Sequence, residues 1–167
     1  MVAVRRPRPE HDAAIATDPV AARLAALRLL NRRDHTGLEL ASKLVERGFE
    51  RGTADSVVAA LVRERLVDDA RHAEHRVAAL AARGQGPVRI AQGLKELGVA
   101  PETVEAVVDA RAAEWVERCR SVRRRRFGTR LPAGFAERGR QARFLAYRGF
   151  SAEQIRAALG GEGESVE

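Results

Sequence analysis

The chain has little of what disulfide-bonded, secreted or membrane-spanning proteins depend on. Its 167 residues include a single cysteine, Cys119, so no intramolecular disulfide can form. No apolar run approaches the roughly 18 residues of a membrane-spanning helix, and prolines and charges follow the basic N-terminus where a signal peptide has its apolar core. Aromatic residues make up only 4%. We therefore expect a cytoplasmic protein whose thin core of Ala, Leu and Val depends on neighbouring units.

One six-residue pattern occurs three times. A leucine stands four residues before a glycine, and an apolar residue follows it; the glycines are Gly48, Gly98 and Gly149, spaced by 50 and 51 residues. A fixed period of this size is typical of helical repeat proteins, and a glycine after an apolar helix is typical of a left-handed C-terminal cap. No segment alternates apolar and polar residues as a half-buried strand does. The sequence predicts an all-α fold, an elongated array of three tandem three-helix repeats of helix-turn-helix type.

Start signals for helices support this organisation. Asp18 before Pro19, Thr36 before Gly37, and Ser151 are the expected N-caps of three helices. We expect the repeats at residues 19–67, 68–114 and 115–160. A flexible basic and proline-containing tail is expected at residues 1–18, and a second flexible tail at residues 161–167.

The positive charge of the chain lies in one segment. The formal net charge is +7, but residues 116–148 hold eleven arginines against two acidic residues, a net +9, which leaves −2 for the rest. Such a segment is an expected dock for DNA phosphates or for an acidic protein surface. The alternative is a solvated helix face with a basic loop, because four consecutive arginines cannot share one face of a helix. The candidate partner-binding or DNA-binding residues are Arg118, Arg120, Arg123, Arg124, Arg125, Arg126, Arg130, Arg138, Arg140, Arg143 and Arg148.

Aromatic side chains and the cysteine of the same region allow further interpretations. Phe135, Phe144 and Tyr147 offer stacking surfaces for single-stranded bases, although the favoured interpretation of each is a core residue. Neighbouring arginines lower the pKa of a thiol, so Cys119 is worth considering as a nucleophile. No histidine lies near it in the sequence, and we expect no catalytic thiol.

A metal site is the other chemical hypothesis. His72 and His75, with Asp68 and Asp69, have a spacing that places imidazoles on one helix face. They make no closed ligand set, and the two aspartates are better explained as a cap at the start of a helix. The glycines around residue 85 lack the lysine of a phosphate-binding loop and indicate a linker. We expect no metal, no cofactor and no enzymatic activity.

Four blocks of the chain resemble the RecX family in order and spacing. The resemblance spans roughly residues 21–160, with two departures, His72 where the family usually has phenylalanine and Ala54 where a larger aliphatic residue is common. The blocks are residues 38–44 with Gly48 and Phe49, and then residues 66–74, 84–90 and 144–151.

The resemblance implies a nonenzymatic regulator of the bacterial recombinase RecA, with roles in DNA repair, recombination and the SOS response. Members bind the RecA filament on single-stranded DNA, lie in its groove and damp its ATPase, strand-exchange and coprotease activities. We expect a monomer that also contacts single-stranded DNA and, nonspecifically, duplex DNA. Two alternatives stay open. One is a passive helical scaffold, and the other is a stand-alone helix-turn-helix DNA-binding protein, with Gln92, Lys95, Gln141 and Arg143 as its base readers.

Overall fold

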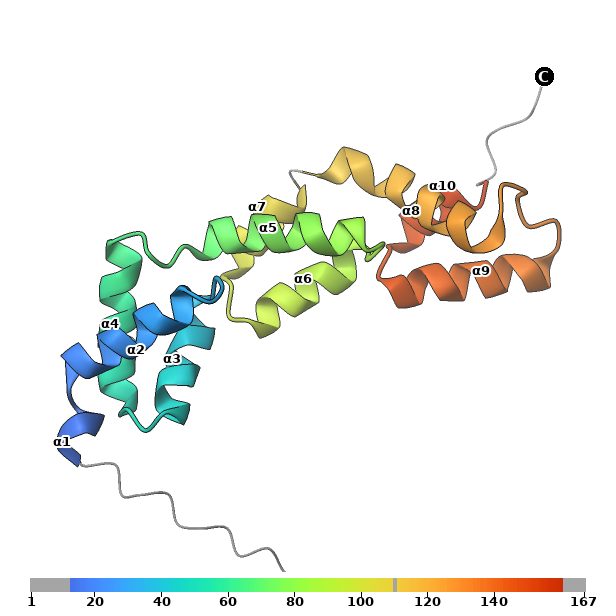
Figure 1. The fold of residues 1–167 in the computed structure, drawn as a ribbon. Helices are drawn as coiled ribbons and strands as arrows, with labels where there is room; N and C mark the ends of the chain where they lie inside the picture. Colours follow the sequence, from blue (N-terminus) through green and yellow to red (C-terminus); the bar gives the residue numbers. More distant parts are fainter. Residues whose placement is uncertain (1–12, 110, 161–167) are drawn as a thin grey trace, which may run out of the picture. The chain divides into compact units, whose positions relative to one another are not determined.

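In the computed structural model, residues 13–109 and 111–160 are described, and every regular element in these ranges is an α-helix (Figure 1). This confirms the expected all-α fold of three tandem three-helix repeats, which are α2–α4, α5–α7 and α8–α10. The helices are α1 (Ala13–Ala16), α2 (Pro19–Leu30), α3 (Gly37–Glu46), α4 (Arg51–Arg63), α5 (Asp69–Ala82), α6 (Pro87–Glu96), α7 (Pro101–Asp109), α8 (Ala112–Phe127), α9 (Phe135–Arg148) and α10 (Ala152–Ala158).

The two expected tails lie largely outside the described residues, which exclude residues 1–12 and 161–167. Residues 13–16, assigned to the first tail, instead form the short helix α1. Alanine has the highest helix propensity of all residues, and this segment is mostly alanine. The backbone carbonyl of Ala16 accepts a hydrogen bond from the N–H of Glu50 at 2.9 Å, which fastens α1 to the start of α4.

The three repeated glycines end α3, α6 and α9 in one common way. Gly48, Gly98 and Gly149 have φ angles of +97°, +78° and +92°, the left-handed conformation that favours glycine. The residue after each glycine donates its N–H to the carbonyl of the leucine five positions earlier, at 3.2 Å in all three cases. Those leucines and the following apolar residues are buried. This is the Schellman motif with its apolar contact, as the sequence pattern predicts.

The three expected N-caps are also present. The side chains of Asp18 and Thr36 accept from backbone N–H groups at 2.8 Å and 3.2 Å. Ser151 accepts from the N–H of Gln154 at 3.2 Å, and the Gln154 side chain accepts in return from the Ser151 N–H at 2.9 Å. This reciprocal capping box fixes the first turn of α10, because it satisfies two backbone donors that a helix start leaves unpaired.

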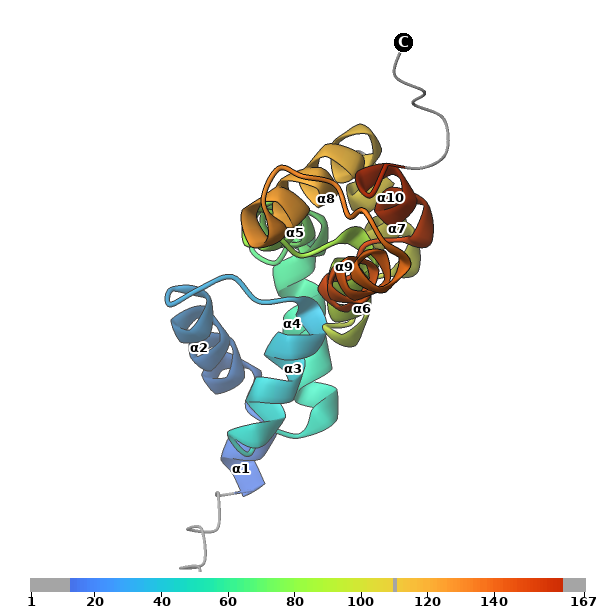
Figure 2. The same cartoon turned by 90° about the vertical axis from the view of Figure 1, so that its right-hand side faces the viewer.

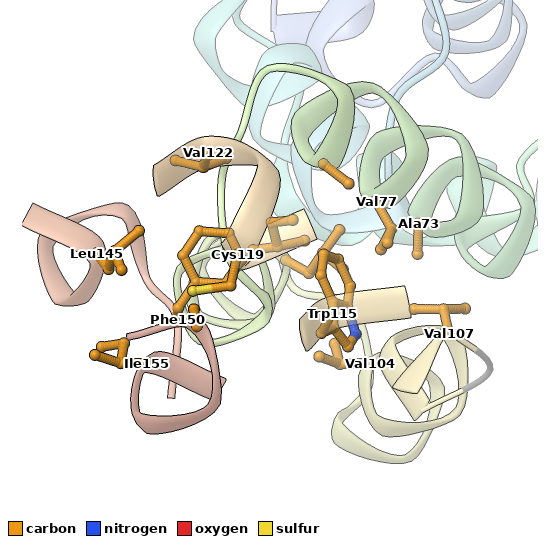
Figure 3. Packing of buried hydrophobic residues seen from close by; sticks show 14 of the residues in the cluster. Ala73, Val77, Val104, Val107, Trp115, Cys119, Val122, Leu145, Phe150 and Ile155 are labelled. Atoms are coloured by element: carbon orange, nitrogen blue, oxygen red, sulfur yellow. The ribbon is translucent and has the colours of Figure 1, made fainter. Parts of the chain in front are cut away.

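The described chain divides into two compact units, one up to His72 and one from Ala73 onward. The first unit has its own core, made of α2, α3 and α4 and centred on Leu40, Leu44 and Leu61. The core of the second unit is shared by two repeats. It joins Val77 and Val104 of the second repeat to residues of α8, α9 and α10, among them Trp115, Cys119, Leu145 and Ile155 (Figure 3). The second and third repeats therefore fold as one body.

The end of α9 meets the start of α6 inside this second unit (Figure 1 and Figure 2). The N–H of Gly86 donates to the carbonyl of Arg148 at 2.8 Å, and the N–H of Val88 donates to the carbonyl of Gly149 at 3.0 Å. Unpaired donors of one helix start thus meet unpaired acceptors of one helix end, and the two helix dipoles point the same way. We call this contact the α6–α9 joint.

Glycine is required on both sides of the α6–α9 joint. A Cβ atom on Gly86 would lie 2.3 Å from the backbone carbonyl carbon and oxygen of Gly149. A Cβ atom on Gly149 would lie 2.3 Å from Cβ of Arg89 and 2.7 Å from its backbone nitrogen. The glycines around residue 85 do connect two helices, α5 and α6, as expected of a linker. Gly86 in addition allows two backbones to approach closely, which only the contact with the third repeat reveals.

Candidate partner and nucleic-acid interface

The eleven arginines of residues 116–148 lie on α8, on α9 and on the loop between them. They differ in what their guanidinium groups contact. Some hydrogen-bond to backbone carbonyls, some pair with glutamates, and some have neither kind of partner among the described residues. Only side chains of the last two groups can be offered to another molecule without breaking the fold.

Arg123 is a structural residue. Arg123 is only 3% exposed. One terminal nitrogen donates to the carbonyl of Arg130 at 2.8 Å, and the other donates to the carbonyl of Thr129 at 3.2 Å. Arg123 thereby holds the loop between α8 and α9 from inside. The expectation that it contacts a partner is wrong, because the side chain is buried and both terminal nitrogens donate to backbone carbonyls of the loop.

Replacing Arg123 with methionine is expected to lower the free energy of unfolding by about 2 kcal/mol, because two carbonyls lose a charged donor. Urea denaturation measures the loss, and limited proteolysis shows whether the loop has opened. The matched control is Arg125→Met, in which an exposed arginine of the same helix is changed and stability should stay within about 0.5 kcal/mol. Equal stabilities of the two variants would contradict this role for Arg123.

Two further arginines hold backbone groups together. Arg148 donates through Nε to the carbonyl of Gly84 at 2.9 Å, which ties α9 to the end of α5 beside the α6–α9 joint. Arg138 donates to the carbonyl of Gly160 at 2.7 Å, just after α10. Both side chains are half-buried. Their charge contributes to the local field, but part of their hydrogen-bonding capacity is used within the protein.

Four arginines pair with glutamates on the surface. Arg118 lies 2.6 Å from Glu114, and Arg124 lies 2.6 Å from Glu117. The hydrogen bonds that these arginines donate hold the pKa values of Glu114 and Glu117 below their ordinary value, so both carboxylates stay ionised near neutral pH. Exposed ion pairs of this kind are weak, and a polyanion can compete for the arginine. The other two members, at longer distances, are Arg120 with Glu117 and Arg140 with Glu137.

Four arginines remain without an acidic partner among the described residues, and we call them the open arginines. They are Arg125, Arg126, Arg130 and Arg143, and all four are exposed. Three lie at the end of α8 or in the loop that follows, and Arg143 lies on α9. The guanidinium carbon of Arg126 is 5.8 Å from the centre of the Phe127 ring. The open arginines can meet phosphate or carboxylate groups without breaking an ion pair with a described residue.

Two aromatic side chains expected in the core lie on the surface. Phe135 is 95% exposed and Tyr147 is 72% exposed, whereas Phe144 packs edge-on against Phe127 with ring centres 5.3 Å apart. The guanidinium carbon of Arg89 lies 5.2 Å from the centre of the Tyr147 ring, and Arg89 donates to the Tyr147 carbonyl at 3.0 Å. Arg89 is thus a further surface cation beside the basic segment. Nothing in the sequence signals it, because it belongs to the second repeat.

Cys119 lies in the core of the second unit (Figure 3). Burial raises the pKa of its thiol from 9.0 to about 12, and the nearby charge of Arg120 opposes this only in part. The idea that neighbouring arginines lower this pKa is therefore wrong. A thiol that stays protonated and has no access to solvent is a poor nucleophile.

The Cys119 thiol is expected to react with a disulfide reagent at pH 8 at least about a hundred times more slowly in the native protein than in 6 M guanidinium chloride, since thiolate and access are both lacking. Folding raises the pKa of the thiol, because burial disfavours the thiolate. The contribution of the protonated Cys119 thiol to the free energy of unfolding is therefore complete below about pH 9 and is lost as the pH rises toward 12. Cys119→Ala is the control that should remove the reaction. Rapid labelling of the folded protein would contradict the burial.

The two aspartates considered for a metal site have other roles. Asp68 accepts from the N–H of Arg71 at 3.0 Å, which is the expected cap of α5. Asp69 accepts from the N–H of Gly37 at 2.9 Å and so caps α3 instead. In the described part of the chain, no three His, Cys, Asp or Glu side chains gather in a way that suits a metal ion.

Within the same ranges, no helix has both the length and the apolar character to span a bilayer.

Two of the four base readers proposed for a helix-turn-helix protein are engaged inside the chain. Gln92 donates to Glu96 at 3.0 Å, and the buried Gln141 donates to Glu137 at 3.1 Å. Lys95 and Arg143 are exposed. Sequence readout in the major groove depends on amide and guanidinium groups that reach base edges. Of the four proposed base readers, only Lys95 and Arg143 therefore stay available to DNA, and both are cations.

Comparison with known proteins places all three repeats in one family. Residues 22–61, 68–108 and 112–159 match the family models for the first, second and third three-helix domains of RecX. The regulatory protein RecX of Halorhodospira halophila is 48% identical over 147 residues, which cover 88% of this chain and 91% of that protein. The regulatory protein RecX of Pseudomonas savastanoi pv. phaseolicola is 37% identical over 145 residues, which cover 87% and 94%.

The fold has a solved counterpart. The crystal structure of RecX from Lactobacillus salivarius superposes with a TM-score of 0.74 at 20% identity, covering 86% of this chain and 95% of that one. The three domain matches, in order along the chain, agree with the three helical repeats described above. The relatives are named regulatory proteins, and together these matches show that the chain belongs to the RecX family of regulatory proteins.

Proposed function

We propose that this chain binds, as a cytoplasmic monomer, the filament that RecA forms on single-stranded DNA and inhibits its ATPase, recombinase and coprotease activities. The observation that carries the proposal is the match of all three RecX domains in order between residues 22 and 159. We take the repeats to extend over residues 19–67, 68–114 and 115–160, except that the third repeat begins at Ala112, where α8 starts, and not at residue 115. No catalytic step is involved, because the effect comes from binding alone.

Binding of this kind regulates through mass action. A filament repeats its surface along its length, so a ligand with several weak sites gains avidity when its geometry matches that repeat. A ligand that prefers one state of the filament then shifts the population toward that state. In this proposal the open arginines meet DNA phosphate or acidic recombinase surface, and the paired arginines Arg118, Arg120, Arg124 and Arg140 add exchangeable contacts.

The test is the rate of ATP hydrolysis by RecA on single-stranded DNA, measured with increasing amounts of this protein. We expect suppression when the protein is present at fewer copies than RecA, because one bound molecule affects a run of filament subunits. The same titration on RecA without DNA provides the baseline. Undiminished hydrolysis at a twofold excess of this protein over RecA would remove the proposal.

A second candidate function is nonspecific binding to DNA without RecA. The observation that favours it is the exposure of Phe135 and Tyr147 beside arginines, since aromatic rings next to cations suit stacked bases and phosphates. Titration of single-stranded and duplex oligonucleotides at several salt concentrations separates the two functions. Tight, sequence-selective duplex binding would favour the second candidate, whereas weak and strongly salt-dependent binding agrees with an auxiliary role.

A further inference from the structure

A groove of about 440 Å³ lies between α9 and α10 on the third repeat. Its lining is largely apolar and includes Ala142 of α9 with Ile155 of α10. The almost fully exposed ring of Phe135 lies at the first turn of α9 and also lines the groove. A surface of this kind has room for a few apolar side chains but is too open to enclose a small molecule.

Arginines add a second feature to the lining of this groove. Arg138, Arg143 and Arg156 all belong to it. Arg143 and Arg156 are exposed and have no acidic partner among the described residues, and Arg138 uses one nitrogen to reach the carbonyl of Gly160. No acidic side chain lines the groove. The groove therefore presents apolar surface within a positive field.

We propose that this groove binds an amphipathic helical segment of a protein partner, with two or more apolar residues on one face and aspartate or glutamate beside them. Helices dock into apolar grooves through side chains spaced by three or four residues. Acidic residues next to those anchors pair with Arg143 and Arg156, which gives the contact its charge complementarity. Phe135 adds an exposed aromatic ring, a type of side chain that is enriched at protein interfaces.

Charge and surface chemistry favour a protein segment over nucleic acid at this place. Phosphate groups are satisfied by arginines alone and gain nothing from the aliphatic surface around Ala142 and Ile155. The open arginines of the α8 end and its loop, Arg125, Arg126 and Arg130, lie outside the groove lining and suit phosphate better. The third repeat thus has two adjacent surfaces of different chemistry.

The inference rests on the proposed function in one respect, the choice of RecA as the source of the segment. The probes are fluorescent overlapping 20-residue peptides that cover the RecA sequence, and binding to the full chain is followed by anisotropy at 150 mM salt. We expect the tightest binders to carry net negative charge and apolar residues at helical spacing. Their affinity should fall at least about tenfold in Ala142→Glu and in the double variant Arg143→Glu, Arg156→Glu.

The matched control is the double variant Arg28→Glu, Arg32→Glu, which makes the same change in net charge on the first unit and should bind the peptides within about twofold of wild type. Circular dichroism checks that each variant is folded. The inference is overturned if no RecA peptide binds, if the control loses as much affinity as the groove variant, or if a 15-residue oligothymidylate displaces the bound peptide. It is also overturned if removal of residues 161–167 creates the binding, because their three glutamates would then be the natural occupant.

Failure of this inference and failure of the proposed function give different results. Wild-type protein that suppresses ATP hydrolysis by RecA, together with groove variants that suppress it equally, keeps the function and removes the groove as a docking site. Wild-type protein without any effect on hydrolysis removes the proposed function, whatever the peptides do.

Discussion

Replacing Gly149 with alanine is expected to lower the free energy of unfolding of the second unit by about 3 kcal/mol or more. Two costs add. The backbone at Gly149 has a φ of +92°, which a residue with a Cβ atom rarely adopts. The new Cβ atom would also lie 2.3 Å from Cβ of Arg89 and 2.7 Å from its backbone nitrogen, so α6 has to move.

The same displacement would weaken the α6–α9 joint. The hydrogen bond from Val88 to the carbonyl of Gly149 and the one from Gly86 to the carbonyl of Arg148 both require this close approach. Since the second and third repeats share one core, loosening the joint should reduce the cooperativity of unfolding as well as its free energy. Urea denaturation followed by circular dichroism measures both, through the midpoint and the slope.

Gly93→Ala is the matched control. Gly93 lies inside α6, has no neighbouring atom within 4 Å of an added Cβ, and has no positive φ. Alanine there should stabilise the protein by up to about 1 kcal/mol, because glycine is the poorer helix former. Loss of stability at Gly93 equal to that at Gly149 would show that the joint is not the cause.

Reversing the three open arginines that lie outside the groove, in the variant Arg125→Glu, Arg126→Glu, Arg130→Glu, is expected to raise the concentration needed for half-inhibition of RecA at least about tenfold. A variant that makes fewer phosphate contacts releases fewer counterions from DNA when it binds. The slope of log K against log salt concentration should therefore become shallower by about one unit per lost contact. The measurements are the half-inhibitory concentration in the ATPase assay and its change between 50 and 200 mM salt.

The control for this variant reverses Arg28, Arg32 and Arg76 instead. These are exposed arginines outside the basic segment without an acidic partner among the described residues, so the total charge changes equally. Half-inhibition by the control should stay within about threefold of wild type. Equal losses in both variants would mean that net charge, and not the basic segment, governs binding.

Local signals in the sequence were enough to predict the helices and their repetition. The residues after Gly48, Gly98 and Gly149 donate hydrogen bonds that reach back five residues and end the helices. Thr36 and Ser151 cap helices by accepting hydrogen bonds from residues three positions later. Such contacts depend on neighbours along the chain, so residue type and spacing reveal them. The family resemblance rests on the same regularity, and the comparison with known proteins agrees with it.

Which arginines bind within the protein and which stay exposed depends on contacts between residues far apart in the sequence. Arg148 reaches a carbonyl 64 residues away, and Arg89 reaches Tyr147 across 58 residues. Arg123 and Arg125 belong to the same run of four arginines, yet Arg123 is buried and Arg125 is exposed. The reason is that successive residues of a helix point about 100° apart. Which side of α8 faces the core depends on how α9 and α10 pack against it, and that packing is a property of the folded chain.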